Sequence, residues 1–514
     1  MAATSIRQAL ELALQHQQAG RLREAEFIYR KILAVQPNEP NSLQLLGLTL
    51  LAAGDAAGAI DFLKTAAEVD SRAAVRVNLG VALHTAKRYD EAIACLQGVA
   101  ADSVDCAEAH YNLGKVYGDI GRLEEAIAAY QTAVRMKPAL AEGWMNLANA
   151  LRTANRLDAA LEAATHAIEL KRDSAEFHYN LGHIHKDLHG FEQAMRAYSR
   201  AAALNPDYAE PRRDASFLKL LLGHFAEGWR EYEWRWKCKD APLPSWHGAL
   251  WPWQGHDLRG RRILLSTEQG YGDAIQFIRY VPMLVDRGAE VSVVCARPLH
   301  RLFSTMAGIR QILGPGDVIG QFDFHAMLLS LPHLLGTTLD TVPAKVPYLS
   351  AQQADMGRWA EKVRADDGVR KVGLVWAGNP GHTNDRLRSI PLELVKPLSA
   401  VPRVTFYSLQ KGAAFAEVEE WGMTDFTAEL NDFADTAAVI ANLDLVIAVD
   451  TSVAHLAGAL GKPVWILLSH VPDWRWLLNR DDSPWYPTAR LFRQKTRADW
   501  SPVIAAVASA LAER

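Results

Sequence analysis

The residues best suited to chemistry stand in LVIAVDTSVAHLAGALGKPVWILL, residues 445–468. Asp450, Thr451 and Ser452 follow an apolar run that is typical of a buried strand, and a helix is expected over 452–460. Thr and Ser are good N-cap residues, and the first turn of a helix has free N–H groups at the positive end of its dipole. The stretch predicts a phosphate or diphosphate site, with an ordinary capped helix as the alternative. Asp450 is unusual beside an anion, and we expect it to accept from a sugar hydroxyl or to fix the loop.

The elements around this stretch alternate between strand and helix. Such alternation predicts parallel sheets with right-handed crossovers, and two series divided near residue 350 predict two Rossmann-like halves. Ligands bind at the carboxyl ends of parallel strands, which is where Asp450 stands. The predicted strands are 262–267, 290–295, 310–313, 322–329, 371–378, 403–409, 443–449 and 463–468. The predicted helices are 274–287, 298–306, 391–399, 413–421, 432–442 and 452–460, with a helical linker around 352–366.

The first half of the chain is a repeat with a period of 33 or 34 residues. A small residue at the point where two helices cross lets their backbones touch, and stacked units form a superhelix with a concave groove. The segment HYNLGKVYGDIGRLEEAIAAYQTAVRMKP, residues 110–138, resembles the tetratricopeptide repeat, and we expect six full repeats over 6–206 and a weaker seventh over 209–236. Such grooves bind extended peptides or proteins. The small residues are Ala25, Ala59, Ala92, Ala126, Ala160, Ala194 and Gly228, and turns are expected near Gly20, Gly54 and Gly121.

Two histidines of one repeat, His185 and His189, lie four residues apart on a predicted helix, which is metal-ligand spacing. His185 occupies the repeat position of Tyr117, and His189 occupies that of Gly121. We therefore interpret them as repeat-position substitutions and predict no metal site.

Six tryptophans lie between residues 229 and 253, where the repeat ends. They suit either an aromatic acceptor platform or the apolar contacts that dock the last repeat on the next domain, and the second interpretation is favoured because Trp buries a large area with few rotatable bonds. They are Trp229, Trp234, Trp236, Trp246, Trp251 and Trp253.

Charge and hydropathy exclude several classes of protein. The net charge of −4 gives no general attraction to nucleic acid or anionic lipid. The four cysteines show no metal or disulfide spacing. The N-terminus lacks a signal-peptide pattern, and the chain has no run of about 18 uncharged apolar residues, so we expect a cytoplasmic protein without a membrane span.

Three segments of the second half resemble the bacterial heptosyltransferase-like glycosyltransferases. They are LLSTEQGYGDAIQFIRYVPMLVDRGAEVSVVC, VGLVWAGNP and DLVIAVDTSVAHLAGALGKPVWIL, and DWRWLLNRDDSPWYPTARLFRQ is similar to a variant fused to tetratricopeptide repeats. The resemblance covers about 262–495 and implies a GT-B fold, a nucleotide-sugar donor, and neither metal nor other cofactor. With the repeats, the architecture is similar to bacterial glycosyltransferases that modify proteins, flagellin included, and in outline to O-GlcNAc transferase.

The resemblance places the family's cleft aspartate, a candidate general base, at Asp273. A base is needed because an acceptor hydroxyl has a very high pKa and must lose its proton as it attacks the anomeric carbon. Gly270 and Gly272 are expected to let the backbone approach a ligand closely, with a tight turn as the alternative.

On the donor side, the resemblance aligns a phosphate-binding helix start with Thr451, Ser452, Val453 and His455. The family's usual lysine after the first strand is absent. Arginine can bind phosphate in two-pronged fashion, so we expect Arg388, and after it Arg386, to replace the lysine, with a plain surface loop as the alternative. Weaker candidates at strand ends are Asn379, His382, Gln410 and Lys411.

The predicted fold is an α-solenoid followed by an α/β GT-B fold of two Rossmann-like halves. The predicted function is metal-independent, inverting transfer of a sugar from a nucleotide-sugar to a hydroxyl of a protein held by the repeats. A glycan or lipid-linked acceptor, and an inactive repeat scaffold, are the alternatives. The predicted parts are the repeat superhelix 1–236, a Trp/Pro-rich linker 237–260, the acceptor-side half 261–350 and the nucleotide-sugar half 351–514.

Overall fold

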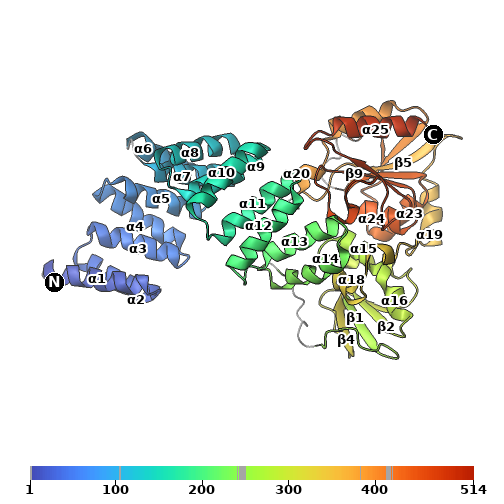
Figure 1. Cartoon of the computed structure of the whole chain (residues 1–514), viewed down its shortest axis with the longest axis horizontal. Helices are drawn as coiled ribbons and strands as arrows, with labels where there is room; N and C mark the ends of the chain where they lie inside the picture. The colour runs from blue at the N-terminus through green and yellow to red at the C-terminus, as the bar shows by residue number, and fades with distance from the viewer. Residues whose placement is uncertain are drawn as a thin grey trace. The chain divides into compact units, whose positions relative to one another are not determined.

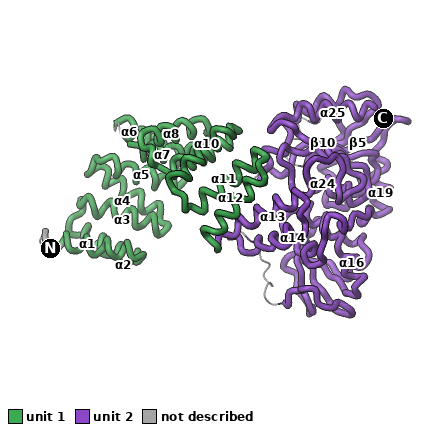
Figure 2. Tube along the Cα trace, in the orientation of Figure 1, with its two compact units in different colours: residues 1–206 green, residues 207–514 purple. Residues whose placement is uncertain are grey.

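The computed structural model describes residues 3–102, 106–239, 241, 250–382, 384–411, 418 and 421–513. They form two compact units, residues 1–206 and 207–514 (Figure 2). Trp246 and most of the predicted helix 413–421 lie outside the described residues.

The first unit consists of helical hairpins, as its repeat predicts (Figure 1). The turn inside a hairpin needs a left-handed residue, and φ is 73° at Gly20, 87° at Gly54 and 77° at Gly121. His189 has φ 60° at the same repeat position, which confirms that it substitutes for a turn glycine. The described helices are α1 (Ala3–Gln18), α2 (Leu22–Val35), α3 (Pro40–Ala52), α4 (Ala56–Val69), α5 (Ala73–Thr85), α6 (Tyr89–Asp102), α7 (Ala107–Asp119), α8 (Leu123–Met136), α9 (Ala141–Thr153), α10 (Leu157–Leu170), α11 (Ala175–Asp187) and α12 (Phe191–Leu204).

Small residues allow the helices of each hairpin to approach closely. A Cβ atom at Gly114 would lie 2.6 Å from the Tyr130 ring, and one at Gly80 would lie 2.6 Å from Leu96. Ala126 on α8 has no exposed surface. The structure thus confirms the physical reason for the small-residue period.

Two further helices, α13 (Glu210–Leu221) and α14 (Phe225–Tyr232), continue the repeat period but belong to the second unit. The compact division after Pro206 therefore differs from the predicted boundary at 236. Its cause is aromatic packing: the buried Trp229 ring lies 6.0 Å from Phe277 and 5.0 Å from Trp474. Trp229 therefore docks the last repeat as predicted, whereas Trp251 is 79% exposed and docks nothing.

Within the second unit, the part between residues 261 and 350 contains a parallel sheet of order β3-β2-β1-β4. The predicted helix 274–287 is wrong in its bounds: α15 (Tyr271–Phe277) begins earlier and a 3-10 turn separates it from α16 (Val281–Val285), whose first turn contains Pro282. Gly270 is the N-cap of α15, and Gly272 lies inside the helix. The other elements are β1 (Arg262–Ser266), β2 (Glu290–Val294), β3 (Ile309–Leu313), β4 (Phe324–Met327), α17 (His300–Phe303) and α18 (Leu331–Leu334).

The part from residue 351 to the C-terminal helix contains a parallel sheet of order β10-β9-β8-β5-β6-β7, in which β8 and β9 are buried along their length. Five of the elements named here, β7, β10, α20, η7 and α25, were not predicted. The strands are β5 (Arg370–Val375), β6 (Val404–Ser408), β7 (Thr424–Asp425), β8 (Leu445–Val449), β9 (Val464–Leu468) and β10 (Ala489–Arg493). The described helices include α19 (Gln353–Ala360), α20 (Asp385–Arg388), α21 (Leu392–Val395), α23 (Phe433–Ala441), α24 (Ser452–Ala459), the 3-10 helix η7 (Trp474–Trp476) and α25 (Ser501–Ala512).

Candidate active site

The candidate residues follow strands at the points where the strand order of each sheet reverses. In the second sheet, β5 and β8 are neighbours, and the chain leaves them in opposite directions. In the first sheet, β1 pairs with β2 on one side and with β4 on the other, and the chain runs from β1 through β2 and β3 before it returns to β4. Such switch points leave room for ligands beyond the carboxyl ends of the strands. Asp450 follows β8 and Asp273 follows β1, so each half presents its candidate at its own switch point.

The side chain of the N-cap residue does not cap the start of helix α24. Thr451 is the N-cap residue, yet its side chain makes no capping hydrogen bond, and its buried Oγ1 has no hydrogen-bond partner among the described residues. In contrast, Asp432 caps α23 with bonds of 2.9 Å and 3.1 Å to two amides. Thr451, Ser452 and Val453 are all partly exposed. This helix start therefore keeps the hydrogen-bonding capacity that a diphosphate site requires.

Asp450 lies beside this helix start, near one carboxylate, Asp473, and two arginines, Arg388 and Arg475. Burial raises the pKa of Asp450 to about 6, and the neighbouring Asp473 carboxylate adds to that increase. Arg388 donates from Nη1 to the Asp450 carbonyl oxygen at 3.1 Å. A carboxyl with this pKa is partly protonated near neutrality, which reduces its repulsion of an anion.

Arg388 is the better placed of the two predicted arginines. Its Nε donates to Asp385 at 3.2 Å, and it joins the loop after β5 to the residue after β8. It thus stands at the switch point of the sheet. Arg386 is an exposed side chain of the same short helix α20.

The weaker candidates mostly shape the loops. Gln410 accepts from the amides of Trp376 at 3.2 Å and Ala377 at 2.8 Å, and so holds the end of β5. Asn379 is exposed and accepts from the Gly381 amide at 3.0 Å. Lys411 donates to the Leu430 carbonyl. Burial and the nearby Arg388 lower the pKa of His382, so its imidazole is neutral at pH 7.

His455 is buried and neutral rather than a cation for phosphate. Its Nδ1 lies 2.9 Å from the Tyr486 hydroxyl, its Nε2 lies 3.8 Å from Asp450, and its ring stacks on Trp476 at 5.4 Å. Burial first, and Arg475 second, hold the pKa of His455 well below its usual value. The imidazole therefore fixes the packing behind the start of α24.

Asp273 is held on two sides. Its Oδ2 accepts from the Gly270 amide at 2.9 Å, and its Oδ1 forms an ion pair with Arg475 of η7. The side chain remains 18% exposed. Burial raises the pKa of Asp273, whereas Arg475 lowers it by a smaller amount. The result is a carboxylate that is more basic than an ordinary aspartate, which suits a general base.

The two halves meet where these candidates stand. A Cβ atom at Gly272 would lie 3.4 Å from Cα of Ser452, so α15 packs directly against the start of α24. Gly272 therefore permits a close approach between two helices, and Gly270 is compatible with the extended conformation of an N-cap.

Sequence reasoning missed Arg475 as an individual residue, although the segment DWRWLLNRDDSPWYPTARLFRQ, which contains it, is part of the family resemblance. Only 7% of Arg475 is exposed, and its guanidinium lies 4.1 Å from the centre of the Trp474 ring. The signal was an arginine between two tryptophans, since such a residue is a candidate for a buried, stacked ion pair.

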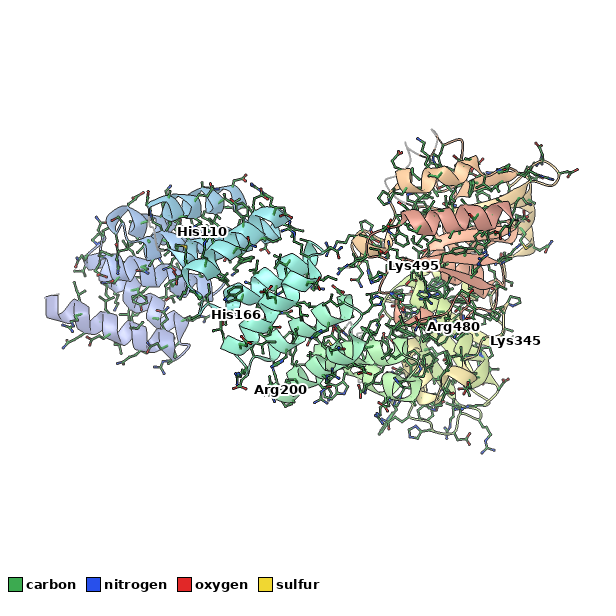
Figure 3. The ribbon with its side chains drawn as sticks, turned by 45° about the horizontal axis from the view of Figure 1, so that its top comes forward. His110, His166, Arg200, Lys345, Arg480 and Lys495 are labelled. Carbon is green, nitrogen blue, oxygen red and sulfur yellow. The ribbon has the colours of Figure 1, made fainter. Side chains whose placement is uncertain are left out.

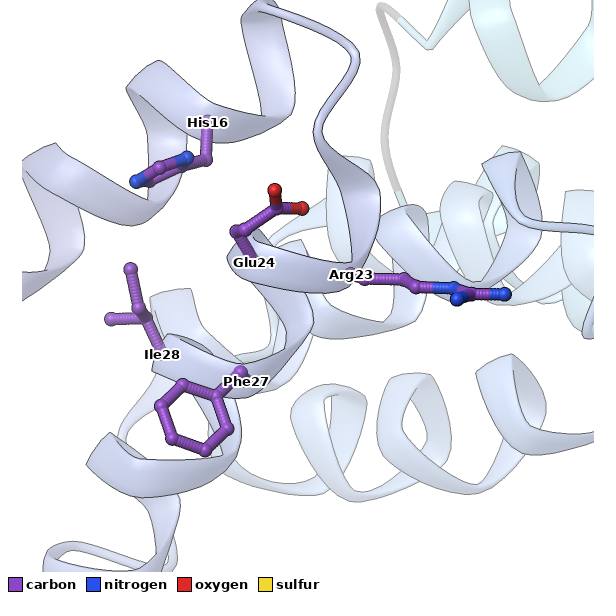
Figure 4. A pocket seen from close by; sticks show the side chains of 5 residues that line it. All are labelled: His16, Arg23, Glu24, Phe27 and Ile28. Atoms are coloured by element: carbon purple, nitrogen blue, oxygen red, sulfur yellow. The ribbon is translucent and has the colours of Figure 1, made fainter.

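A separate pocket lies on the first repeat (Figure 4). It is lined by His16, Arg23, Glu24, Phe27 and Ile28, and Phe27 is 59% exposed. None of the predicted donor-site residues contributes to it. The charged residues labelled in Figure 3, such as Arg480 with its partner Asp482 at 2.6 Å, also lie outside the candidate site.

The fold and the site together define a class: tetratricopeptide repeats joined to a GT-B-like domain of two parallel-sheet halves. The sequence matches agree with this class. Residues 413–473 match the family described as glycosyltransferase family 9 (heptosyltransferase). Residues 77–141, 111–175 and 175–208 match tetratricopeptide repeat families, and residues 18–99 match the family described as anaphase-promoting complex, cyclosome, subunit 3. The chain is thus similar to repeat proteins fused to a heptosyltransferase-like domain.

A curated relative, Protein FlbA of Caulobacter vibrioides, is 30% identical over 320 residues. The match covers 57% of this chain and 53% of FlbA, so the chain spans about half the length of the curated relative that it matches. Among solved structures, MamA is 28% identical, with 31% of this chain and 94% of that chain covered and a TM-score of 0.29. YrrB, described as a tetratricopeptide repeat protein with an unusual peptide-binding site, is 20% identical, with coverages of 36% and 95% and a TM-score of 0.30. None of the helices in the described residues is long and apolar enough to cross a bilayer.

Proposed function

We propose that this protein is a metal-independent, inverting glycosyltransferase that moves a sugar from a nucleotide-sugar to a hydroxyl group of a protein. The observation that carries the proposal is the contact of two helices: α15, which bears the carboxylate Asp273, packs on the uncapped start of α24 at Ser452. One helix offers a base and the other offers amides for a diphosphate, as a single-displacement transfer requires.

The reaction needs one proton transfer and one displacement. Asp273 takes the proton of the acceptor hydroxyl as its oxygen attacks the anomeric carbon. The bond from that carbon to the diphosphate oxygen breaks on the opposite face, which inverts the configuration. The nucleoside diphosphate leaves with the bonding electron pair.

The departing diphosphate needs compensation of its charge. The amides at Ser452 and Val453 and the Thr451 hydroxyl supply hydrogen bonds at the positive end of the α24 dipole. Arg388, which contacts the Asp450 carbonyl, supplies positive charge from the loop after β5. These groups need no metal ion, which supports a metal-independent mechanism.

The repeats are proposed to hold the protein acceptor. Asn78, Asn112, Asn146 and Asn180 recur every 34 residues on the first helix of four successive repeats, and all are partly exposed. An amide side chain can both donate to and accept from a peptide backbone. A row of such amides suits an extended segment of a protein, and flagellin is the first acceptor to test.

Intact-protein mass spectrometry of acceptors co-expressed with the chain tests the proposal, because the added mass identifies the sugar. The Asn112→Ala/Asn146→Ala variant is expected to lose transfer to protein while it retains hydrolysis of the donor. Gln131→Ala, an exposed amide on α8 of the same repeat, is the matched control. A variant that transfers sugar to protein at the wild-type rate would refute capture by the repeats and favour a glycan or lipid-linked acceptor.

The ion pair on Asp273 is the observation that favours the other candidate, an inactive scaffold. A carboxylate that only binds Arg475 and Gly270 would be structural. A panel of UDP-, GDP-, ADP-, CMP- and dTDP-sugars, assayed for nucleotide release, separates the two. Release from none of them would support the scaffold.

A further inference from the structure

We propose that Arg475, in the nucleotide-sugar half, is a positioning residue: it orients the candidate base Asp273 of the acceptor-side half and favours the ionised form of its carboxylate. The inference rests on the function proposed above and assigns control of the base to a residue of the opposite half.

The guanidinium of Arg475 uses each of its nitrogen atoms. Nη2 binds Asp273 Oδ1, Nε donates to Gln276 Oε1 at 2.6 Å, and Nη1 donates to Asp473 Oδ1 at 2.8 Å. Asp273 and Gln276 lie on one helix, α15, three residues apart. Arg475 therefore holds that helix by two points, which fixes both the position and the rotation of the carboxylate.

The arginine itself is held in place. Only 7% of Arg475 is exposed, and its guanidinium lies 4.1 Å from the Trp474 ring centre and 5.8 Å from that of Phe277. Asp473 also accepts from the backbone amide of Arg475 at 3.0 Å. A guanidinium so restrained loses little further entropy when it binds a carboxylate.

The carboxylate keeps capacity for a substrate. An ionised carboxylate has about four acceptor positions. Arg475 takes one on Oδ1 and the Gly270 amide takes one on Oδ2. The side chain is 18% exposed, so the remaining positions are available to an acceptor hydroxyl.

Two neighbours have opposite effects on the pKa of Asp273: Arg475 of η7 and Asp473, the N-cap residue of η7. Burial is the main factor that raises the pKa of Asp273; Arg475 lowers that pKa, and Asp473 raises it. In the part of the chain that the structure describes, further charged or titratable groups around this site include His382 and Arg388 after β5, Tyr232 of α14, and Asp450 and His455 at α24.

Substitutions of Arg475 and of Asp473 should shift the pKa of Asp273 in opposite directions. Arg475→Met removes a cation that favours the ionised form, so Asp273 stays protonated to higher pH and the acidic limb of kcat/KM moves up by about one to three pH units. Asp473→Asn removes an anion while an amide oxygen can still accept from Arg475, so the acidic limb moves down. If Arg475 and Asp473 had only a structural role, their substitutions would lower activity but would not move the acidic limb of the kcat/KM profile in opposite directions.

The test combines two measurements on the full chain. The first is the pH profile of kcat/KM for the donor that the nucleotide-sugar panel identifies. The second is an infrared difference titration of each variant with and without Asp273→Asn, which reports protonation of this one carboxyl and needs no donor. Arg480→Met, an arginine paired with Asp482 elsewhere, is the matched control and should move neither.

Opposite shifts in Arg475→Met and Asp473→Asn, with a smaller upward shift in Arg475→Lys, support the inference. If Arg475→Met fails to fold, the Arg475→Lys and Asp473→Asn variants still test the inference. Unchanged titration of Asp273 in both variants overturns it. If donor turnover is present but no titration moves, the inference fails and the proposed function stands. If no donor is turned over but the infrared shifts occur, the proposed function fails and control of Asp273 by Arg475 remains.

Discussion

Gly272 of α15 and His455 of α24 are in direct contact: a Cβ atom at Gly272 would lie 2.8 Å from Cδ2 of the imidazole. His455 cannot retreat, because its ring stacks on Trp476 and its Nδ1 bonds to Tyr486. The contact brings the carboxylate of one half to the helix start of the other, so the size of one side chain at position 272 controls the geometry of the site.

Gly272→Ala is therefore expected to lower the free energy of unfolding by about 1–3 kcal/mol, the usual range for overpacking, and to reduce sugar transfer. Urea unfolding and the nucleotide-release assay measure the two effects. Gly98→Ala is the control, because a Cβ there meets nothing within 4 Å inside helix α6 and should increase stability by up to about 1 kcal/mol. Equal stability of Gly272→Ala and wild type would show that the helices are not in contact.

Asp273→Asn should reduce kcat for sugar transfer by at least about a hundredfold, the usual contribution of a general base. The amide oxygen can accept from Gly270 or from Arg475 but cannot replace both bonds of the carboxylate, so some loss of stability is expected, while circular dichroism should still show a folded protein. Asp286→Asn, an exposed carboxylate of the same half, should retain wild-type turnover. Full activity of Asp273→Asn would assign the base elsewhere.

Thr451→Val should weaken binding of nucleoside diphosphates by about tenfold, the value of one hydrogen bond of about 1.4 kcal/mol. It should leave helix stability unchanged, because Thr451 makes no capping bond. Asp55→Ala is the contrasting control: Asp55 caps α4 through the Gly58 amide at 2.8 Å, so its loss should cost about 1 kcal/mol without an effect on binding. Calorimetric titration with UDP, GDP and ADP provides the readout, and unchanged affinity in Thr451→Val would remove Thr451 from the site.

Asp450→Asn should increase stability at pH 8 and have a much smaller effect at pH 4. Burial raises the pKa of Asp450 to about 6, above its unfolded value near 4. The folded state thus binds the proton more tightly, so ionisation as the pH rises from about 4 through 6 costs stability, on the order of 1–3 kcal/mol by pH 8. Thermal unfolding across this pH range tests the prediction. A loss of stability at pH 8 would show that the ionised carboxylate stabilises the fold.

The sequence predicted the repeat unit well because its signal is local and periodic. Gly80 and Gly114 occupy the same position in successive repeats, and each allows the two helices of its own hairpin to come into contact. The parallel strands were also predicted, since buried strands such as β8 are continuous apolar runs. Strand β10 was missed because Ala489–Arg493 is short and contains two arginines, so it lacks the continuous apolar run of a strand such as β8.

The candidate site was predicted only in part, because its geometry depends on contacts between distant residues. Asp273 and Arg475 are separated by 202 positions, and no local pattern connects them. The bounds of α15 were misjudged because glycines were read as a loop, whereas Gly272 is helical and faces His455.

The most direct of these experiments is a crystal structure of the full chain with a nucleoside diphosphate, with UDP, GDP and ADP tried in turn. The account predicts phosphate oxygens within hydrogen-bonding distance of the Ser452 and Val453 amides and the Thr451 hydroxyl, with Arg388 alongside and Asp273 facing the sugar position. A nucleotide bound with its phosphates away from the start of α24 would contradict it.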